Sequence, residues 1–196
     1  MTTPAVTRPT STRPLRVAGV LFIVAGLASI AANATIQYAE SIHRAPPDTF
    51  GPLVLIVPEL AAAGIASLSF LVAFILMFAW QPRFGWQLLF LIAAFGYLLE
   101  ATRFLNLGGS IIGDLVVGVG TVAAGLNVFA RNIFTRGPSV LFLITMVIAQ
   151  LPLVVSIFAP QPDAVIFVSE YVIAVLYVVC GVAMIRGART RSTATE

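Results

Sequence analysis

Residues 58–80 read PELAAAGIASLSFLVAFILMFAW. The stretch holds one charged side chain, that of Glu59, at its start, and is otherwise apolar or small. A helix of about 20 apolar residues is long enough to cross the hydrocarbon core of a bilayer. Residues 58–80 therefore predict a membrane-spanning helix.

The whole chain shares this composition. Of its 196 residues, 59% are hydrophobic and 10% are charged, whereas a soluble domain is about 45–50% apolar and about 25% charged. A soluble domain of this size buries only about 70% of the surface of its unfolded chain, so the surplus apolar surface must face lipid. We therefore expect an all-α, polytopic integral membrane helix bundle that is surrounded by the lipid bilayer.

Apolar runs recur along the chain, separated by breaks rich in Pro, Gly, Asn and Arg. They predict six transmembrane helices, at about 16–38, 58–80, 84–105, 110–130, 138–158 and 164–186.

The ends of the chain differ from its middle. A six-helix transmembrane domain is predicted at 14–186, between tails at 1–13 and 187–196 that are rich in Thr, Ser, Arg and Pro and are expected to be disordered in the cytoplasm. Residues 50–57 are also apolar, and we expect Pro58 to separate a short interfacial segment from the second span.

Arginine counting predicts the orientation, because cytoplasmic loops carry an excess of basic residues. With six spans, one side of the membrane receives nine arginines: Arg8, Arg13, Arg16, Arg83, Arg131, Arg136, Arg186, Arg189 and Arg191. The other side receives only Arg44 and Arg103. The acidic residues follow the opposite partition, with Glu196 alone on the arginine-rich side. Both termini are therefore predicted to be cytoplasmic.

The use of arginine without lysine, together with the Ala, Gly and Val content, is typical of a GC-rich bacterial genome. The expected location is thus the bacterial cytoplasmic (inner) membrane. An alternative concerns residues 1–34, in which Arg13, Arg16 and the apolar run 17–31 before Ala32-Asn33-Ala34 also match a cleavable signal peptide. Its removal would leave five spans in the same orientation.

Polar side chains gather in the outer half of the predicted spans, whereas the inner half contains no charge. The candidate ligand-binding residues are Glu59, Tyr97, Glu100, Arg103, Asp114, Gln150 and Glu170. A charge at membrane depth costs about 2.5–3.5 kcal/mol on insertion scales, so such residues face the bundle interior and form pairs. Glu100 and Arg103 are spaced i, i+3 and share one helix face. Arg103 is the basic group available to the carboxylates of this layer.

This polar layer has two interpretations. It forms an outward-facing acidic pocket around Arg103, or it only joins the helices near a wet interface. Small residues in the fourth run, Gly109, Gly113, Gly118, Gly120 and Gly125, allow close helix packing. That packing lies within the bundle or, alternatively, in a homodimer through the fourth helix.

The sequence excludes several kinds of site. Gly118 to Ala123 match a dinucleotide fingerprint, but they lie within a predicted span and follow no strand. His43 is the only histidine and Cys180 the only cysteine, which excludes multi-histidine or cysteine-based metal cages. We expect no catalytic residues, no metal, no cofactor and no nucleic-acid partner.

Three function classes remain. The sequence favours a non-enzymatic accessory or sensor subunit, whose polar acidic layer near the outer face receives a membrane-protein partner. The alternative is binding or transport of a small cationic, neutral or lipidic molecule in a pocket around Arg103. An enzyme that acts at the outer leaflet, with a carboxylate as general base, is the least favoured.

Overall fold

The structure, a computed structural model, describes residues 11–43, 52–81, 85–103, 111–158 and 163–193; at 39–43, 52–57, 59, 102–103, 111–112, 156–157, 163–164 and 189–193 it describes the backbone alone. All regular secondary structure in these residues is helical. The helices are α1 (Arg13–His43), α2 (Pro52–Trp80), α3 (Leu88–Arg103), α4 (Ile111–Arg131), α5 (Arg136–Phe158) and α6 (Asp163–Thr193). The predicted all-helical fold is confirmed.

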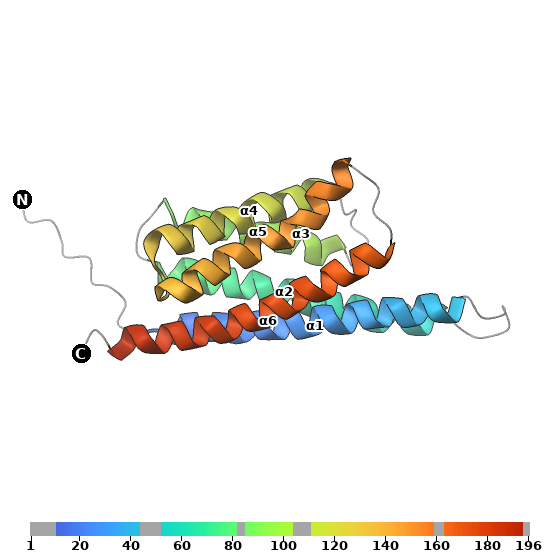
Figure 1. The fold of residues 1–196 in the computed structure, drawn as a ribbon, viewed down its shortest axis with the longest axis horizontal. Coiled ribbons are helices and arrows are strands. Elements are labelled where there is room, and N and C mark those ends of the chain that lie inside the picture. The colour runs from blue at the N-terminus through green and yellow to red at the C-terminus, as the bar shows by residue number, and fades with distance from the viewer. Residues whose placement is uncertain (1–10, 44–51, 82–84, 104–110, 159–162, 194–196) are drawn as a thin grey trace, which may run out of the picture.

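The helices form a closed ring. Each packs against its neighbours in the chain, and α6 also packs against α1. In Figure 1, α1 begins and α6 ends at the same end of the bundle, which we call the terminal end. The opposite end, where α1 ends and α2 begins, is the distal end. A ring of this kind leaves a central space that side chains from all six helices reach.

The outside of the ring is apolar. Within the described residues, five helices contain stretches long and apolar enough to cross a membrane: Arg13–Tyr38, Leu60–Trp80, Gly113–Arg131, Arg136–Val155 and Val165–Ala188. Valine and leucine side chains cover their outer faces, with Val119 and Val168 exposed by 66% and 65%. These are the features of a multi-pass membrane protein. The 16 residues of α3 span only about 24 Å.

Two helices differ from their predicted bounds. Pro58 does not divide the second apolar run, because α2 is continuous from Pro52 to Trp80 with the proline inside it. A proline removes one backbone donor, and here the helix continues through it. At the other end of the chain, α6 continues to Thr193, into the tail predicted to be disordered from 187. Gly187 packs against Phe134 and Pro138, so tertiary contact carries the helix past the predicted end of the span.

Glycines bring neighbouring helices into backbone contact. A Cβ on Gly181 of α6 would lie 2.5 Å from the Gly19 carbonyl oxygen of α1. A Cβ on Gly120 of α4 would lie 2.6 Å from the Ala93 nitrogen of α3. Gly125 faces Leu143 and Met146 of α5. The described α4 glycines therefore contact α3 and α5 of the same chain, which matches the interpretation of packing within the bundle.

Aromatic rings fill the middle of the ring of helices. The cluster, which we call the aromatic cluster, consists of Phe22, Phe70, Phe74, Phe90, Tyr97, Phe134, Phe142 and Tyr177. Phe22 is fully buried at its centre, with its ring centroid 5.1 Å from that of Phe70 and 5.4 Å from that of Phe142. Because the cluster joins opposite sides of the ring, it occupies the centre from its middle toward the terminal end.

Charges are segregated between the two ends. The described arginine side chains, Arg13, Arg16, Arg131, Arg136 and Arg186, belong to the terminal ends of α1, α4, α5 and α6. The described acidic side chains, Glu100, Asp114 and Glu170, belong to the distal halves of α3, α4 and α6.

Candidate ligand-binding cavity

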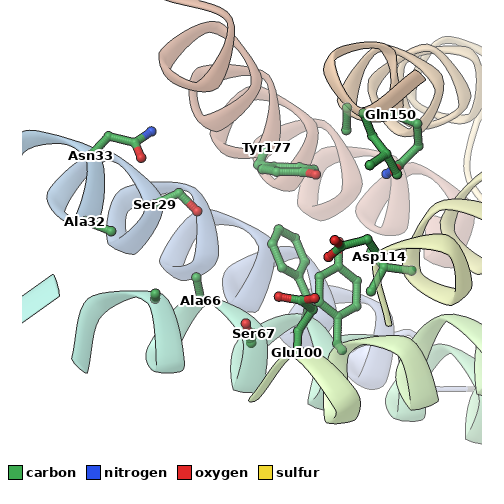
Figure 2. A pocket seen from close by; sticks show the side chains of 15 residues that line it. Ser29, Ala32, Asn33, Ala66, Ser67, Glu100, Asp114, Gln150 and Tyr177 are labelled. Carbon is green, nitrogen blue, oxygen red and sulfur yellow. The ribbon is translucent and has the colours of Figure 1, made fainter. Parts of the chain in front are cut away.

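A cavity of about 370 Å³ lies inside the distal half of the ring (Figure 2). All six helices contribute to its wall. The lining residues are Ser29, Ala32 and Asn33 of α1, Ala63, Ala66, Ser67 and Phe70 of α2, Tyr97 and Glu100 of α3, Asp114 and Val117 of α4, Ala149, Gln150 and Leu153 of α5, and Tyr177 of α6.

The aromatic cluster forms the floor of the cavity. Phe70, Tyr97 and Tyr177 line it and are nearly completely buried. The Phe70 ring stacks on Tyr97 at 4.7 Å between centroids and meets Tyr177 edge-on at 4.6 Å. The hydroxyl groups of Tyr97 and Tyr177 are neighbours. The floor therefore closes the cavity toward the terminal end and presents polar phenol groups on an apolar base.

Two carboxylates lie on one side of the cavity. Glu100 of α3 and Asp114 of α4 face it from the same side, across from Ser29 and Asn33 of α1 (Figure 2). The contact between α3 and α4 explains their proximity, because Gly96 has room for no side chain against Val117. Two helices that pack this closely bring side chains on their facing edges into one site.

Gln150 extends the polar wall from α5. Its Nε2 donates a hydrogen bond to Thr121 Oγ1 of α4 at 3.1 Å. The Thr121 hydroxyl in turn donates to the Val117 carbonyl oxygen at 2.8 Å. These two hydrogen bonds fix the orientation of the Gln150 amide. The Gln150 Oε1 atom lies 3.1 Å from the position that a Cβ on Gly118 would occupy. Gln150 therefore adds a hydrogen-bond acceptor to the side of the cavity that carries the carboxylates.

The opposite wall, formed by α1 and α2, carries mostly small side chains in addition to Asn33 and the Phe70 ring. Ala32, Ala63 and Ala66 contribute methyl groups, and Ser67 contributes a hydroxyl. Ser29 Oγ donates to the Ala25 carbonyl oxygen of its own helix at 2.9 Å, so its donor is engaged within α1. The side of the cavity formed by α3 and α4 is thus acidic, whereas the side formed by α1 and α2 carries mostly small, weakly polar side chains.

The structure gathers four of the seven candidate residues around this cavity: Tyr97, Glu100, Asp114 and Gln150. Glu170 is not among the lining residues; it is half-buried on α6, two turns distal to Tyr177. The side chains of Glu59 and Arg103 lie outside the described part of the structure.

Tyr177 and Phe70 were not among the predicted site residues. An aromatic residue inside an apolar run carries no sign of whether it faces lipid, core or cavity, so the sequence offered no signal for either. Asn33 also lines the cavity and was not among the predicted site residues. The sequence does carry a signal for it, because Asn33, Gln37 and Glu40 are spaced i, i+4, i+7 and form a polar stripe on the first span.

The donor set fits some chemistries better than others. Carboxylate, phenol and amide groups recognise a hydrogen-bond donor or a positive charge. Among the described residues, no group of three or more His, Cys, Asp or Glu side chains is placed to hold a metal ion. No protein-family model, curated protein or solved structure matches this chain.

Proposed function

We propose that this chain is a multi-pass protein of the bacterial cytoplasmic membrane that binds a small organic cation in its distal cavity. In this proposal all six helices cross the bilayer, the terminal end lies in the cytoplasm and the cavity opens toward the outside. The segregation of arginine at the terminal end supports this orientation. The short α3 spans with local thinning of the bilayer, which costs little per Å of mismatch.

One observation carries the proposal: two carboxylates from different helices line one cavity of about 370 Å³, to whose wall all six helices contribute. Ligand sites typically have volumes of about 300–1,000 Å³ and a few convergent polar groups in a largely apolar wall. A carboxylate forms its strongest hydrogen bonds with a donor that carries positive charge. An amine of modest size meets both requirements.

The floor of the cavity favours binding over conduction. The aromatic cluster closes the centre of the ring beneath Tyr97 and Tyr177. A proton-driven pump normally carries ionisable groups to the middle of the membrane, whereas the described acidic side chains stop in the distal half. A receptor or sensor that responds to the ligand accords with the non-enzymatic role that the sequence favours. An accessory subunit without a ligand would leave the cavity unexplained.

Thermal unfolding in detergent tests the proposal. Phenethylamine should raise the melting temperature of the wild-type chain, whereas phenylethanol, of similar shape but neutral, should not. Glu100→Gln and Asp114→Asn should each weaken phenethylamine binding by about 10- to 100-fold, which corresponds to the 1.5–3 kcal/mol of a charge-assisted hydrogen bond. Equal stabilisation by the alcohol, or stabilisation only by a co-purifying protein, would contradict it.

A further inference from the structure

Among the described residues, α6 contributes least to the wall of the cavity. Helices α5 and α6 pack together least of all neighbouring helices in the ring. Of the side chains that the structure describes, α5 contributes Ala149, Gln150 and Leu153 to the lining and α6 contributes Tyr177. No α6 side chain that the structure describes distal to Tyr177 lines the cavity. In Figure 1 the two helices diverge toward the distal end.

Each of these helices is held by its other neighbour. Gln150 ties the distal half of α5 to Thr121 of α4. The distal half of α6 stays on α1, where the Tyr171 hydroxyl donates to Gln37 Oε1 at 3.4 Å. Gly26 of α1 also contacts the α6 backbone, because a Cβ there would lie 2.6 Å from the Ala174 carbonyl oxygen. The distal half of each helix therefore packs on its other neighbour, α5 on α4 and α6 on α1.

In the terminal half the same two helices are closed against each other. Gly187 of α6 packs on Pro138 at the start of α5, with a Cβ position 3.1 Å from Pro138 Cγ. Met146 of α5 and Cys180 of α6 are both buried in the core. The separation of α5 from α6, which we call the α5–α6 seam, is thus confined to the depth of the cavity.

The edges of the seam are apolar. Ala174 of α6 contacts α1. Ile173 and Leu176 lie on the other flank of the Tyr177 face, where Ile173 is partly buried and packs against the core. On α5 the edge is formed by Ala149 and Leu153. Within the ring order, the seam lies across the cavity from α2 and α3. An ammonium group beside Glu100 would therefore have its substituent directed toward the seam and the lipid.

Resting on the proposed function, we propose that the natural ligand is an amphipathic amine dissolved in the bilayer, which enters the cavity sideways through the α5–α6 seam. The ammonium group binds at Glu100 and Asp114, and the hydrocarbon chain passes between α5 and α6. A single-chain alkylamine has this chemistry. A ligand that arrives from water would use the distal mouth instead and would not need an apolar seam.

Binding kinetics in phosphatidylcholine nanodiscs distinguish the two routes. The probes are dodecylamine, which partitions into the bilayer, and phenethylamine, which is delivered from water. Ile173→Trp narrows the seam without changing a lining residue, and Ile173→Ala widens it. Val175→Trp is the matched control, because Val175 lies on the outer face of the same helix and is 51% exposed.

Ile173→Trp should slow dodecylamine association by about tenfold, within the range of association-rate changes among variants of one interface. Ile173→Ala should accelerate it, and Val175→Trp should leave it unchanged. The phenethylamine association rate should stay at the wild-type value in all three, which also shows that the variants fold.

Dodecylamine association that is insensitive to both Ile173 variants would overturn lateral entry. Equal slowing of both amines by Ile173→Trp would overturn it as well, because it would indicate one shared aqueous route. The proposed function would stand in either case. If neither amine binds the wild-type chain, the proposed function itself fails.

Discussion

Gln81 and Asn127, 46 residues apart, exchange two hydrogen bonds at the terminal end of the bundle. Asn127 Nδ2 donates to Gln81 Oε1 at 2.9 Å, and Gln81 Nε2 donates to Asn127 Oδ1 at 3.3 Å. Asn127 Nδ2 also donates to the Trp86 carbonyl oxygen at 3.0 Å. Both amides are buried. The pair joins the end of α2 and the segment before α3 to α4.

Asn127→Ala should lower the free energy of unfolding by about 1–3 kcal/mol, because it leaves the buried Gln81 amide and the Trp86 carbonyl without their partner. Thermal or denaturant unfolding in mixed micelles measures this change.

Replacement of both amides provides the control. Gln81→Met combined with Asn127→Leu removes the donors and acceptors of the amide pair together, a replacement that is close to neutral in itself, and leaves only the Trp86 carbonyl oxygen without its partner. The double variant should therefore be more stable than Asn127→Ala. A double variant that is less stable than the single one would show that the amides do not act as a pair.

Close approach of α3 and α4 gives a second prediction. Gly120→Ala should destabilise the chain by about 1–3 kcal/mol, the usual cost of overpacking, because the new Cβ would lie 2.6 Å from the Ala93 backbone nitrogen. Gly64→Ala is the matched control, since a Cβ at Gly64 of α2 meets nothing within 4 Å. Its stability should stay the same or rise by up to about 1 kcal/mol, the gain from replacing a helical glycine. Equal losses would contradict this packing.

Much of the fold was predictable because chain length across a bilayer is a strong constraint. Each predicted span overlaps one observed helix, with the largest differences at Pro58 in α2 and beyond 186 in α6. The rotation of each helix about its axis was not predictable. Lipid is as apolar as a helix interface, so outward-facing Val119 and inward-facing Val128 look alike in the sequence, although one is 66% exposed and the other fully buried.

The candidate site was predictable to the extent that charge marks it. Glu100 and Asp114 interrupt apolar runs, and the cost of burying them indicated that they face inward. The buried pair of Gln81 and Asn127 was not predicted, because neutral amides near the ends of predicted spans resemble solvated boundary residues. The pairing of Tyr97 with Tyr177 depends on the closure of the helix ring, which no local pattern encodes.

The proposed orientation predicts the outcome of cysteine labelling. The native Cys180 is fully buried and should not react. A membrane-impermeant maleimide should label Thr49→Cys in intact cells, because the 44–51 segment is expected outside. Thr135→Cys, exposed between α4 and α5, should react only after permeabilisation. Reversal of the two patterns would invert the orientation and place the cavity toward the cytoplasm.

Arg103 is predicted to balance the carboxylates of the distal layer. Arg103→Ala should therefore lower the melting temperature more than Arg44→Ala, because loss of a charge partner leaves a carboxylate unsatisfied at a cost of about 1–3 kcal/mol. Arg44, in the predicted first outer loop, should tolerate the change. Equal melting temperatures for the two variants would show that Arg103 has no such role.

Glu170 provides the sharpest test of where the ligand charge is bound. It shares the distal half of the bundle with Glu100 and Asp114 but does not line the cavity. Removal of its charge leaves the cavity wall unchanged, so Glu170→Gln should alter the phenethylamine dissociation constant by less than about twofold, whereas Glu100→Gln should raise it by about tenfold or more. Isothermal titration in detergent at low and high salt measures both. If Glu170→Gln weakens binding as strongly as Glu100→Gln at high salt, where long-range attraction is screened, the ammonium group is not bound at the α3–α4 wall.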